Sequence, residues 1–189
     1  MDLRDWIATE HGSAAARFEQ SVVAHVPLER WTETAGDGGS SIAFLTFHVA
    51  YHEDLAVGAV LGGGTPVLTS WHRRLGLDGL APHVGLAEAE PADLTAALDV
   101  QQLLGYATAV GRATSSWLDG VDIATLDARP DAAAALSTTG VDEAAVPWLY
   151  AMWAGKPATW FVQWEAIGHR VNHVGEMVSV RNRLGLSPF

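Results

Sequence analysis

Two pairs of histidines, each with a four-residue spacing, lie in long apolar segments of this chain. His48 and His52 occur in FLTFHVAYHEDLAVGAVL, and His169 and His173 occur in IGHRVNHVGEM. Side chains four residues apart project within about 40° of each other on an α-helix, because the helix has 3.6 residues per turn. Each pair therefore predicts two imidazoles on one helix face, and two such faces in contact would form a nitrogen-rich pocket.

The segment around the first pair is predicted to be a helix over residues 41–61. A serine at its start can cap the first turn, and the glycines at 62–64 end it. His48 and His52 lie in the middle of its apolar stripe, so we expect both to be buried. Glu53 and Asp54 point away from that stripe, and we interpret them as surface charges.

Apolar periodicity of helical type continues along the rest of the chain. It predicts long helices over residues 2–33, 41–61, 91–118 and 158–184, the first with a break near Gly12 and an end near Pro27. Long connections cover residues 66–90 and 119–148, and a short helix is predicted near 141–154. No alternating strand pattern competes with this interpretation. The chain is therefore predicted to be all-α: a four-helix bundle with long crossover connections, forming a single domain over residues 1–189.

The last predicted helix is apolar on two sides. One stripe contains Phe161 and Val174, and the other contains His169, His173 and Met177. A helix that is apolar on two sides is buried on two sides. We expect the histidine stripe to face the bundle core and the other stripe to contact a further segment or a second subunit, which predicts a homodimer.

Composition narrows the range of partners and compartments. The net charge of −11 disfavours nucleic acid and anionic membrane surfaces as partners. There are no cysteines, so a thiol that takes part in any reaction here must arrive with the substrate. The first twenty residues lack the basic region and apolar run of a secretory signal, and no apolar run is long enough for a transmembrane helix. These features predict a cytoplasmic protein.

The histidine pattern points to metal binding. Neutral imidazole is a good ligand for Zn²⁺, Ni²⁺, Co²⁺ and Fe²⁺. Two histidines from one helix and a third from a facing helix make a three-histidine site with open positions. A single pair at this spacing also occurs by chance, on an ordinary and partly exposed helix face. Four buried histidines without a metal would need hydrogen-bond partners for eight ring nitrogens, and this favours a divalent metal ion of open identity.

Three segments together resemble the DinB-like superfamily of helical-bundle metalloproteins, which includes domains of the mycothiol-dependent maleylpyruvate isomerase type. They are FLTFHVAYHED, GGTPVLTSWHRRLGL and HRVNHVGEMVSVRNRLG, and the resemblance extends over essentially the whole chain. It implies that His48, His169 and His173 bind a divalent metal ion. His52 is extra to that pattern: it could replace or join His48, act as a base behind the ligands, or fill the pocket wall, with His48 favoured as the ligand.

The resemblance also implies chemistry on low-molecular-weight thiols, as S-transfer or thiol-dependent isomerisation. A small-molecule thiol and an electrophile are then the expected partners. A metal held by neutral histidines keeps its positive charge and lowers the pKa of a bound thiol. The alternatives are a metal-dependent hydrolase, a non-catalytic metal- or ligand-binding stress-response protein, and a dimeric scaffold with a degenerate site.

Other polar side chains receive weaker interpretations. Glu165 lies four residues before His169 and could orient it, although a solvated carboxylate is the favoured interpretation. His72 and Arg73 could border the site, with a plain loop role preferred. The tryptophans are expected mainly in the core, with some at the mouth of a substrate pocket. Three histidines show no partner pattern: His11, His25 and His83.

Overall fold

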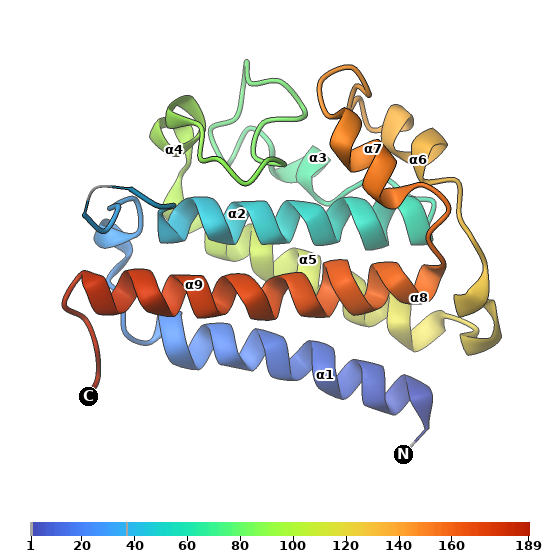
Figure 1. Ribbon diagram of the computed structural model, residues 1–189, viewed down its shortest axis with the longest axis horizontal. Coiled ribbons are helices and arrows are strands. Elements are labelled where there is room, and N and C mark those ends of the chain that lie inside the picture. The colour runs from blue at the N-terminus through green and yellow to red at the C-terminus, as the bar shows by residue number, and fades with distance from the viewer. Residues whose placement is uncertain (1, 37) are drawn as a thin grey trace.

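Long helical segments packed side by side form the body of this computed structural model, which describes residues 2–36 and 38–189 (Figure 1). They comprise α1 (Leu3–Phe18) with η1 (Glu19–Val23), α2 (Ile42–Glu53) with η3 (Asp54–Leu61), α5 (Val100–Gly120), and α8 (Ala158–Trp160) with η5 (Phe161–Gly168) and α9 (His169–Arg183). Here η1, η3 and η5 are π-helical continuations of their neighbours. No strand occurs in the described residues, so the predicted all-α class is confirmed.

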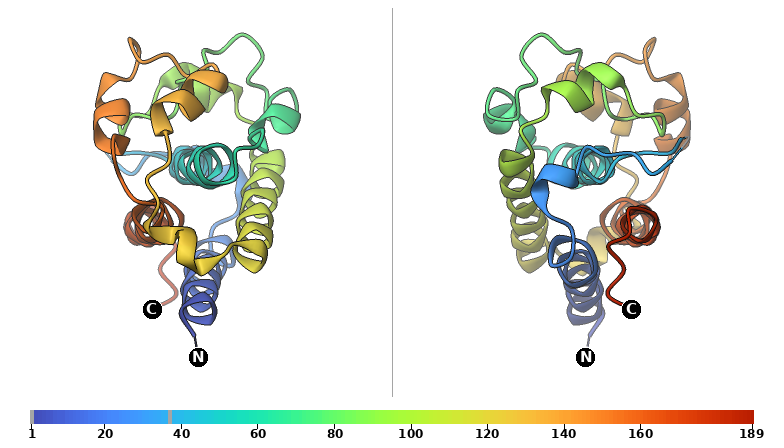
Figure 2. Two further views of the ribbon diagram at one scale, coloured as in Figure 1. Left: turned by 90° about the vertical axis from the view of Figure 1, so that its right-hand side faces the viewer. Right: turned by 90° about the vertical axis from the view of Figure 1, so that its left-hand side faces the viewer.

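Helix α2 packs against both α5 and α9, and α1 packs against the same two helices (Figure 2). Figure 1 shows that α2 and α5 run in one direction while α1 and α9 run in the other. Parallel neighbours cannot be joined by a short turn, so the chain needs a long crossover between α2 and α5. The first of the two predicted long connections is therefore a consequence of the helix directions.

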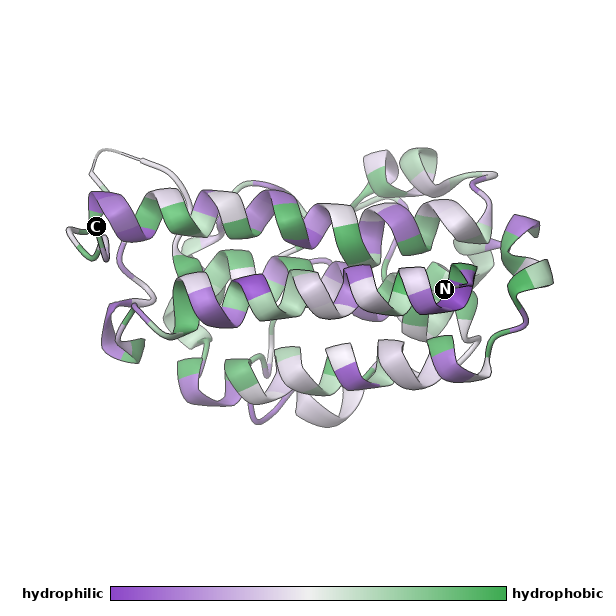
Figure 3. Cartoon of the chain, turned by 90° about the horizontal axis from the view of Figure 1, so that it is seen from below, coloured by the Kyte–Doolittle hydropathy of each residue, from purple (hydrophilic) through white to green (hydrophobic). Residues whose placement is uncertain are grey.

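Both crossovers cover the face of α2 that points away from α1 (Figures 1 and 2). The first carries α3 (Leu68–Trp71) and α4 (Ala92–Ala97), and the second carries η4 (Ile123–Asp127), α6 (Ala132–Thr138) and α7 (Pro147–Trp153). A short turn, η2 (Leu28–Arg30), precedes α2. Because α2 is covered on every side, all of its residues from Ile42 to Glu53 are buried. By contrast, hydrophilic and hydrophobic residues alternate along α1 when the bundle is seen from that side (Figure 3).

The start of α2 is held by its cap and by the first crossover. The Ser41 hydroxyl accepts a hydrogen bond from the Phe44 amide at 3.1 Å, as predicted for a serine cap. The same hydroxyl donates to Glu90 Oε1 at 2.8 Å, and the Ser41 amide donates to Glu90 Oε2. The crossover is thereby tied to the first turn of the helix that bears His48.

Some predicted helix boundaries were wrong. The first helix passes through Gly12 without a break and ends with η1 at Val23. The third divides into α4 and α5 at Leu98, because Asp99 takes an extended backbone and caps α5 by accepting from the amides of Gln101 and Gln102. Helix α6 was not predicted; Asp131 caps it by accepting from the Ala134 amide.

The interpretation of Glu53 as a surface charge was wrong. Its side chain is 0% exposed, because the helices on either side of α2 close over it. The carboxylate accepts hydrogen bonds from His11 Nε2 at 2.9 Å and from Thr114 Oγ1 at 2.7 Å, and it pairs with Arg170. Burial alone would raise the pKa of Glu53, but the Arg170 charge and the His11 and Thr114 hydrogen bonds outweigh it and lower the pKa to about 2.

Asp54 was also wrongly interpreted as exposed, since it is 2% exposed. It accepts the amides of Val67 and Leu68 at 2.8 Å each and the Tyr106 hydroxyl at 3.1 Å. Burial raises its pKa to about 6, against the hydrogen bonds from Leu68 and Val67. Asp54 thus anchors the beginning of the first crossover, as Glu90 anchors its end.

The two apolar stripes of the last helix both contribute to packing within the chain. His169, His173 and Met177 are buried on one stripe, and Phe161 and Val174 are buried on the other. The predicted homodimer stays a prediction. Among the described residues, no helix combines the length and the apolar character needed to cross a membrane.

Candidate metal centre

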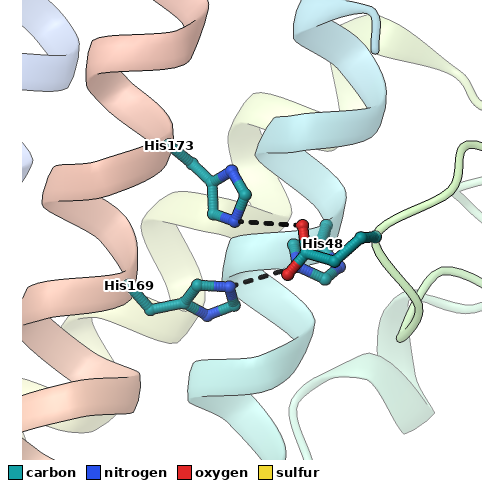
Figure 4. Close-up of side chains that lie close together, drawn as sticks. His48, His169 and His173 are labelled. Carbon is teal, nitrogen blue, oxygen red and sulfur yellow. Dashed lines mark hydrogen bonds and ion pairs between the residues drawn. The ribbon is translucent and has the colours of Figure 1, made fainter. Parts of the chain in front are cut away.

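The three histidines singled out from the sequence lie together between α2 and α9 (Figure 4). His48 comes from α2, while His169 and His173 come from α9 and point toward it. The Nε2 atoms of His48 and His169 are 3.1 Å apart. A glutamate of the first crossover, Glu88, completes the group with Oε1 3.8 Å from His48 Nε2 and Oε2 3.8 Å from His173 Nε2. One ligand atom from each of the four lies within 4.8 Å of the others, so the group could hold a metal ion.

Hydrogen-bond acceptors at the Nδ1 atoms set the orientation of two of these rings. His48 Nδ1 donates to the Gly85 carbonyl oxygen at 2.8 Å. His173 Nδ1 donates to Glu176 Oε2 at 2.9 Å, one turn later on α9. A proton held at Nδ1 leaves Nε2 of a neutral imidazole as a lone pair. Both rings therefore present a free Nε2 to the centre of the group.

Glu165 is fully buried and lies on the Nδ1 side of His169. Its side chain is 0% exposed, so the favoured interpretation as a solvated carboxylate was wrong. Oε1 accepts the Trp153 indole N–H at 2.7 Å, and Oε2 lies 3.5 Å from His169 Nδ1, without hydrogen-bond geometry. Burial would raise the pKa of Glu165, but its contacts with His169 and His52 outweigh burial and lower the pKa to about 2. An ionised Glu165 favours a proton on His169 Nδ1 and leaves His169 Nε2 facing the group.

His52 does not belong to the group of His48, Glu88, His169 and His173, because both of its ring nitrogens contact other acceptors. Its Nε2 lies 2.9 Å from the Leu86 carbonyl oxygen, and its Nδ1 lies 3.2 Å from Glu165 Oε2. His52, Glu165 and His169 form a second, overlapping group whose ligand atoms also lie within 4.8 Å of one another, and all three are buried. His52 thus connects the first crossover to the carboxylate behind His169.

Burial keeps the rings of His48 and His169 neutral. Burial, followed by the proximity of His52, lowers the pKa of His48 to about 2, against the hydrogen bond to Gly85. Burial also lowers the pKa of His169, although its contact with Glu165 opposes this. Neutral imidazole is the form that binds metal ions. The electrostatic environment therefore maintains the ligand form of both residues at neutral pH.

The close approach of two neutral rings fits a bound cation. With both Nδ1 atoms protonated, His48 Nε2 and His169 Nε2 direct lone pairs at each other across 3.1 Å. Moving the proton of His169 to Nε2 would relieve that contact, but it would turn an unprotonated Nδ1 toward the ionised Glu165. A tetrahedral zinc ion holds its nitrogen ligands about 3.4 Å apart, close to the spacing seen here. A divalent ion would satisfy both nitrogens at once.

Two tryptophans lie beside the histidine group, that is, beside His48, His169 and His173. Trp148 is 40% exposed and Trp164 is 37% exposed, whereas Trp31 and Trp153 are fully buried. The Trp148 ring stacks on His52 at 6.2 Å between centroids, and the Trp164 ring stacks on His169 at 6.0 Å. Trp31 and Trp153 thus belong to the core, whereas Trp148 and Trp164 are partly exposed beside the histidines. That the exposed tryptophans border a substrate pocket stays a prediction.

Sequence reasoning missed two carboxylates of this region. Glu176 follows His173 by three residues, a spacing that places the two side chains side by side on a helix, so the pair could have been found. Glu88 lies in a crossover whose path has no periodic signal. His72 and Arg73 instead pair with Asp78, each at 3.4 Å, which agrees with a plain loop role.

Comparisons with known proteins agree with this architecture. The solved structure described as "Crystal structure of the conserved protein of locus from Enterococcus faecalis" is similar, with a TM-score of 0.71, 21% sequence identity, and coverage of 98% of this chain and 99% of that chain. At this identity the likeness bears on the fold alone. A search of curated proteins finds no match. The family model described as the DinB superfamily matches residues 14–177. The chain therefore belongs to the DinB superfamily, as its histidine segments indicated.

Proposed function

We propose that this protein is a metal-dependent enzyme acting on low-molecular-weight thiols, with His48, His169 and His173 as the ligands of a divalent ion. The observation that carries the proposal is the convergence of three Nε2 atoms from two helices, with an acceptor opposite each Nδ1. Rings held in this way lose little conformational freedom when they bind an ion. Either S-transfer or thiol-dependent isomerisation is compatible with such a centre.

His48 is a better ligand than His52 in this arrangement. The Nε2 atom of His48 has no carbonyl or carboxylate within hydrogen-bonding distance among the described residues, whereas both nitrogens of His52 contact acceptors. Using His52 as a ligand would break its bond to Leu86 or its contact with Glu165. The group that contains His48 also has an exposed member, Glu88, and thus a side open to substrate.

The surroundings suit an organic thiol. When bound, a divalent ion at this site supplies positive charge that lowers the pKa of a thiol ligand. Three neutral histidines leave that charge intact. The exposed faces of Trp148 and Trp164 offer apolar contact to the rest of the substrate. The protein has no cysteine of its own, so the reactive sulfur would come from the substrate.

Elemental analysis of the purified protein tests the ligand assignment. We expect close to one equivalent of zinc, nickel or iron per chain, and its loss in His173→Ala. The matched control is His25→Ala, since His25 is exposed and lies outside the group. Equal metal content in wild type and His173→Ala would show that the ligand assignment is wrong.

Conjugation assays test the reaction class. The metal-loaded protein is incubated with an electrophile and with mycothiol, bacillithiol or glutathione, and the thioether product is quantified. We expect turnover that is lost in His173→Ala. A metal-loaded protein that conjugates none of these thiols would contradict the enzymatic part of the proposal, and ester hydrolysis in the same preparation would point to a hydrolase.

A further inference from the structure

A short part of the first crossover, residues 85–88, passes over the histidine group. The Gly85 carbonyl oxygen accepts from His48 Nδ1 at 2.8 Å. The next carbonyl, that of Leu86, lies 2.9 Å from His52 Nε2. Both histidines of α2 therefore contact consecutive carbonyl groups of this segment, which fixes its position above them.

Gly85 allows the segment to approach α2 this closely. It has φ +90°, and a Cβ placed there would lie 2.6 Å from Phe47 Cε1. Both the backbone conformation and the lack of space require glycine. The backbone of the segment is therefore packed directly on the helix, with little freedom to move toward or away from it.

Glu88 follows at the end of this anchored segment. Its two oxygens face different histidines, with 3.8 Å from Oε1 to His48 Nε2 and 3.8 Å from Oε2 to His173 Nε2. The side chain is 78% exposed, and within the described part of the chain these two histidines are its only ion-pair partners. Among the residues that the structure describes, this carboxylate has no hydrogen-bond partner, and it is directed at the position where an ion would be held.

We propose that Glu88 is a displaceable fourth ligand of the metal ion. Its carboxylate occupies the coordination position that the three histidines leave open, until a substrate takes that position. This inference rests on the proposed metal centre. An exposed carboxylate returns to water at little cost, because it was never fully desolvated. The anchored backbone at Gly85 and Leu86 keeps Glu88 within reach, so only its side chain has to swing away. Glu88 thus protects the ion from adventitious ligands and selects for substrates that bind it more strongly than a carboxylate does.

Cobalt substitution tests this role without measuring enzyme activity. Co²⁺ is titrated into metal-free wild type and Glu88→Gln, with the visible absorption spectrum and competition against a chelator as readouts. We expect Glu88→Gln to bind Co²⁺ about tenfold or more weakly and to show an altered spectrum. Azide, a small anion that binds Co²⁺, is expected to bind the Co²⁺-loaded Glu88→Gln protein several-fold more tightly than the wild type.

Asp78→Asn is the matched control. Asp78 belongs to the same crossover and has a 63% exposed side chain, but it pairs with His72 and Arg73 instead of the histidine group. It should leave all three readouts unchanged. If wild type binds no Co²⁺, the metal centre itself is refuted. If wild type binds Co²⁺ and Glu88→Gln matches it in affinity, spectrum and azide binding, only the role of Glu88 is overturned.

Discussion

The Nε2 atoms of His48 and His169 lie 3.1 Å apart, although 121 residues separate them in the chain. Burial lowers the pKa of both rings, so neither nitrogen carries the proton that would make their contact a charged hydrogen bond. The contact is unfavourable for two lone pairs and favourable around a cation. Metal binding at this group would therefore be coupled to the stability of the fold.

Removal of metal should lower the thermal stability. With free ion at a hundred times its dissociation constant, binding adds about 2.7 kcal/mol, which corresponds to about 5–10 °C in Tm for a chain of this size. Differential scanning fluorimetry with and without a chelator measures the shift. His173→Ala should show no such response, and an equal Tm with and without chelator in wild type would refute the coupling.

Glu165→Gln should weaken metal binding while retaining the fold. The amide can still accept the Trp153 N–H, but it no longer places a negative charge near His169 Nδ1. Loss of such a partner behind a ligand costs about 10–100-fold in metal affinity. Competition with a fluorescent chelator measures the affinity, and an unchanged value would show that Glu165 does not support His169.

Gly85→Ala should impair both stability and metal binding. The new Cβ would collide with Phe47 and displace the carbonyl that holds His48 Nδ1. Gly79→Ala is a close control, because Gly79 has the same φ of +90° but nothing within 4 Å of its Cβ position. Both variants carry the strain of a left-handed alanine, about 1–2 kcal/mol. Only Gly85→Ala should also lose metal affinity, and equal losses in the two would contradict this account.

Breaking the buried ion pair between Glu53 and Arg170 should be costly. Glu53→Leu leaves the Arg170 charge buried without its partner, and such losses are about 3–5 kcal/mol. Adding Arg170→Met removes the stranded charge, so the double variant should be more stable than the single one. Urea unfolding monitored by circular dichroism measures the free energy of unfolding of both variants. A double variant that is less stable than Glu53→Leu would show that the two residues are not coupled in this way.

The same carboxylate makes stability dependent on pH in the acid range. The pKa of Glu53 is about 2 in the folded chain and 4.5 in its ordinary state. A folded pKa below the unfolded one means that Glu53 stabilises the fold above about pH 4.5 and that this contribution is lost as the pH falls toward about 2. Glu53→Gln should therefore show a shallower loss of unfolding free energy between about pH 5 and about pH 3. If the unfolding free energies of wild type and Glu53→Gln fell equally with pH, the lowered pKa of Glu53 would be contradicted.

Helical periodicity was enough to predict the long helices, because their apolar stripes repeat at 3.6 residues per turn. It also placed His48 and the His169–His173 pair on apolar faces that were expected to meet, and the resemblance selected these three residues as the ligands. The burial of Glu53 and Asp54 could not be predicted in this way. The residues that surround them come from segments distant in the chain. In addition, a helix that is covered on every side has no solvent-exposed face, so a polar residue in its sequence does not indicate exposure.

The carboxylates near the histidines differ in how far sequence could reach them. Glu176 stands three residues after His173 on the same helix, so its contact is local and predictable. Glu165 was considered, but its burial depends on Trp153 of the second crossover. Glu88 depends on the path of the first crossover, which is set by anchors such as Asp54 and Glu90 and has no periodic signature.

The histidine group draws one member from the first third of the chain and two from its last helix. A nascent chain that stops before α9 carries His48 without either partner, so the pocket is assembled only after α9 has been synthesised and docked. Metal uptake at these residues would then report completion of the fold. An ion held there would also clasp the early and late parts of the chain together, and cleavage within a crossover would leave two fragments joined through it.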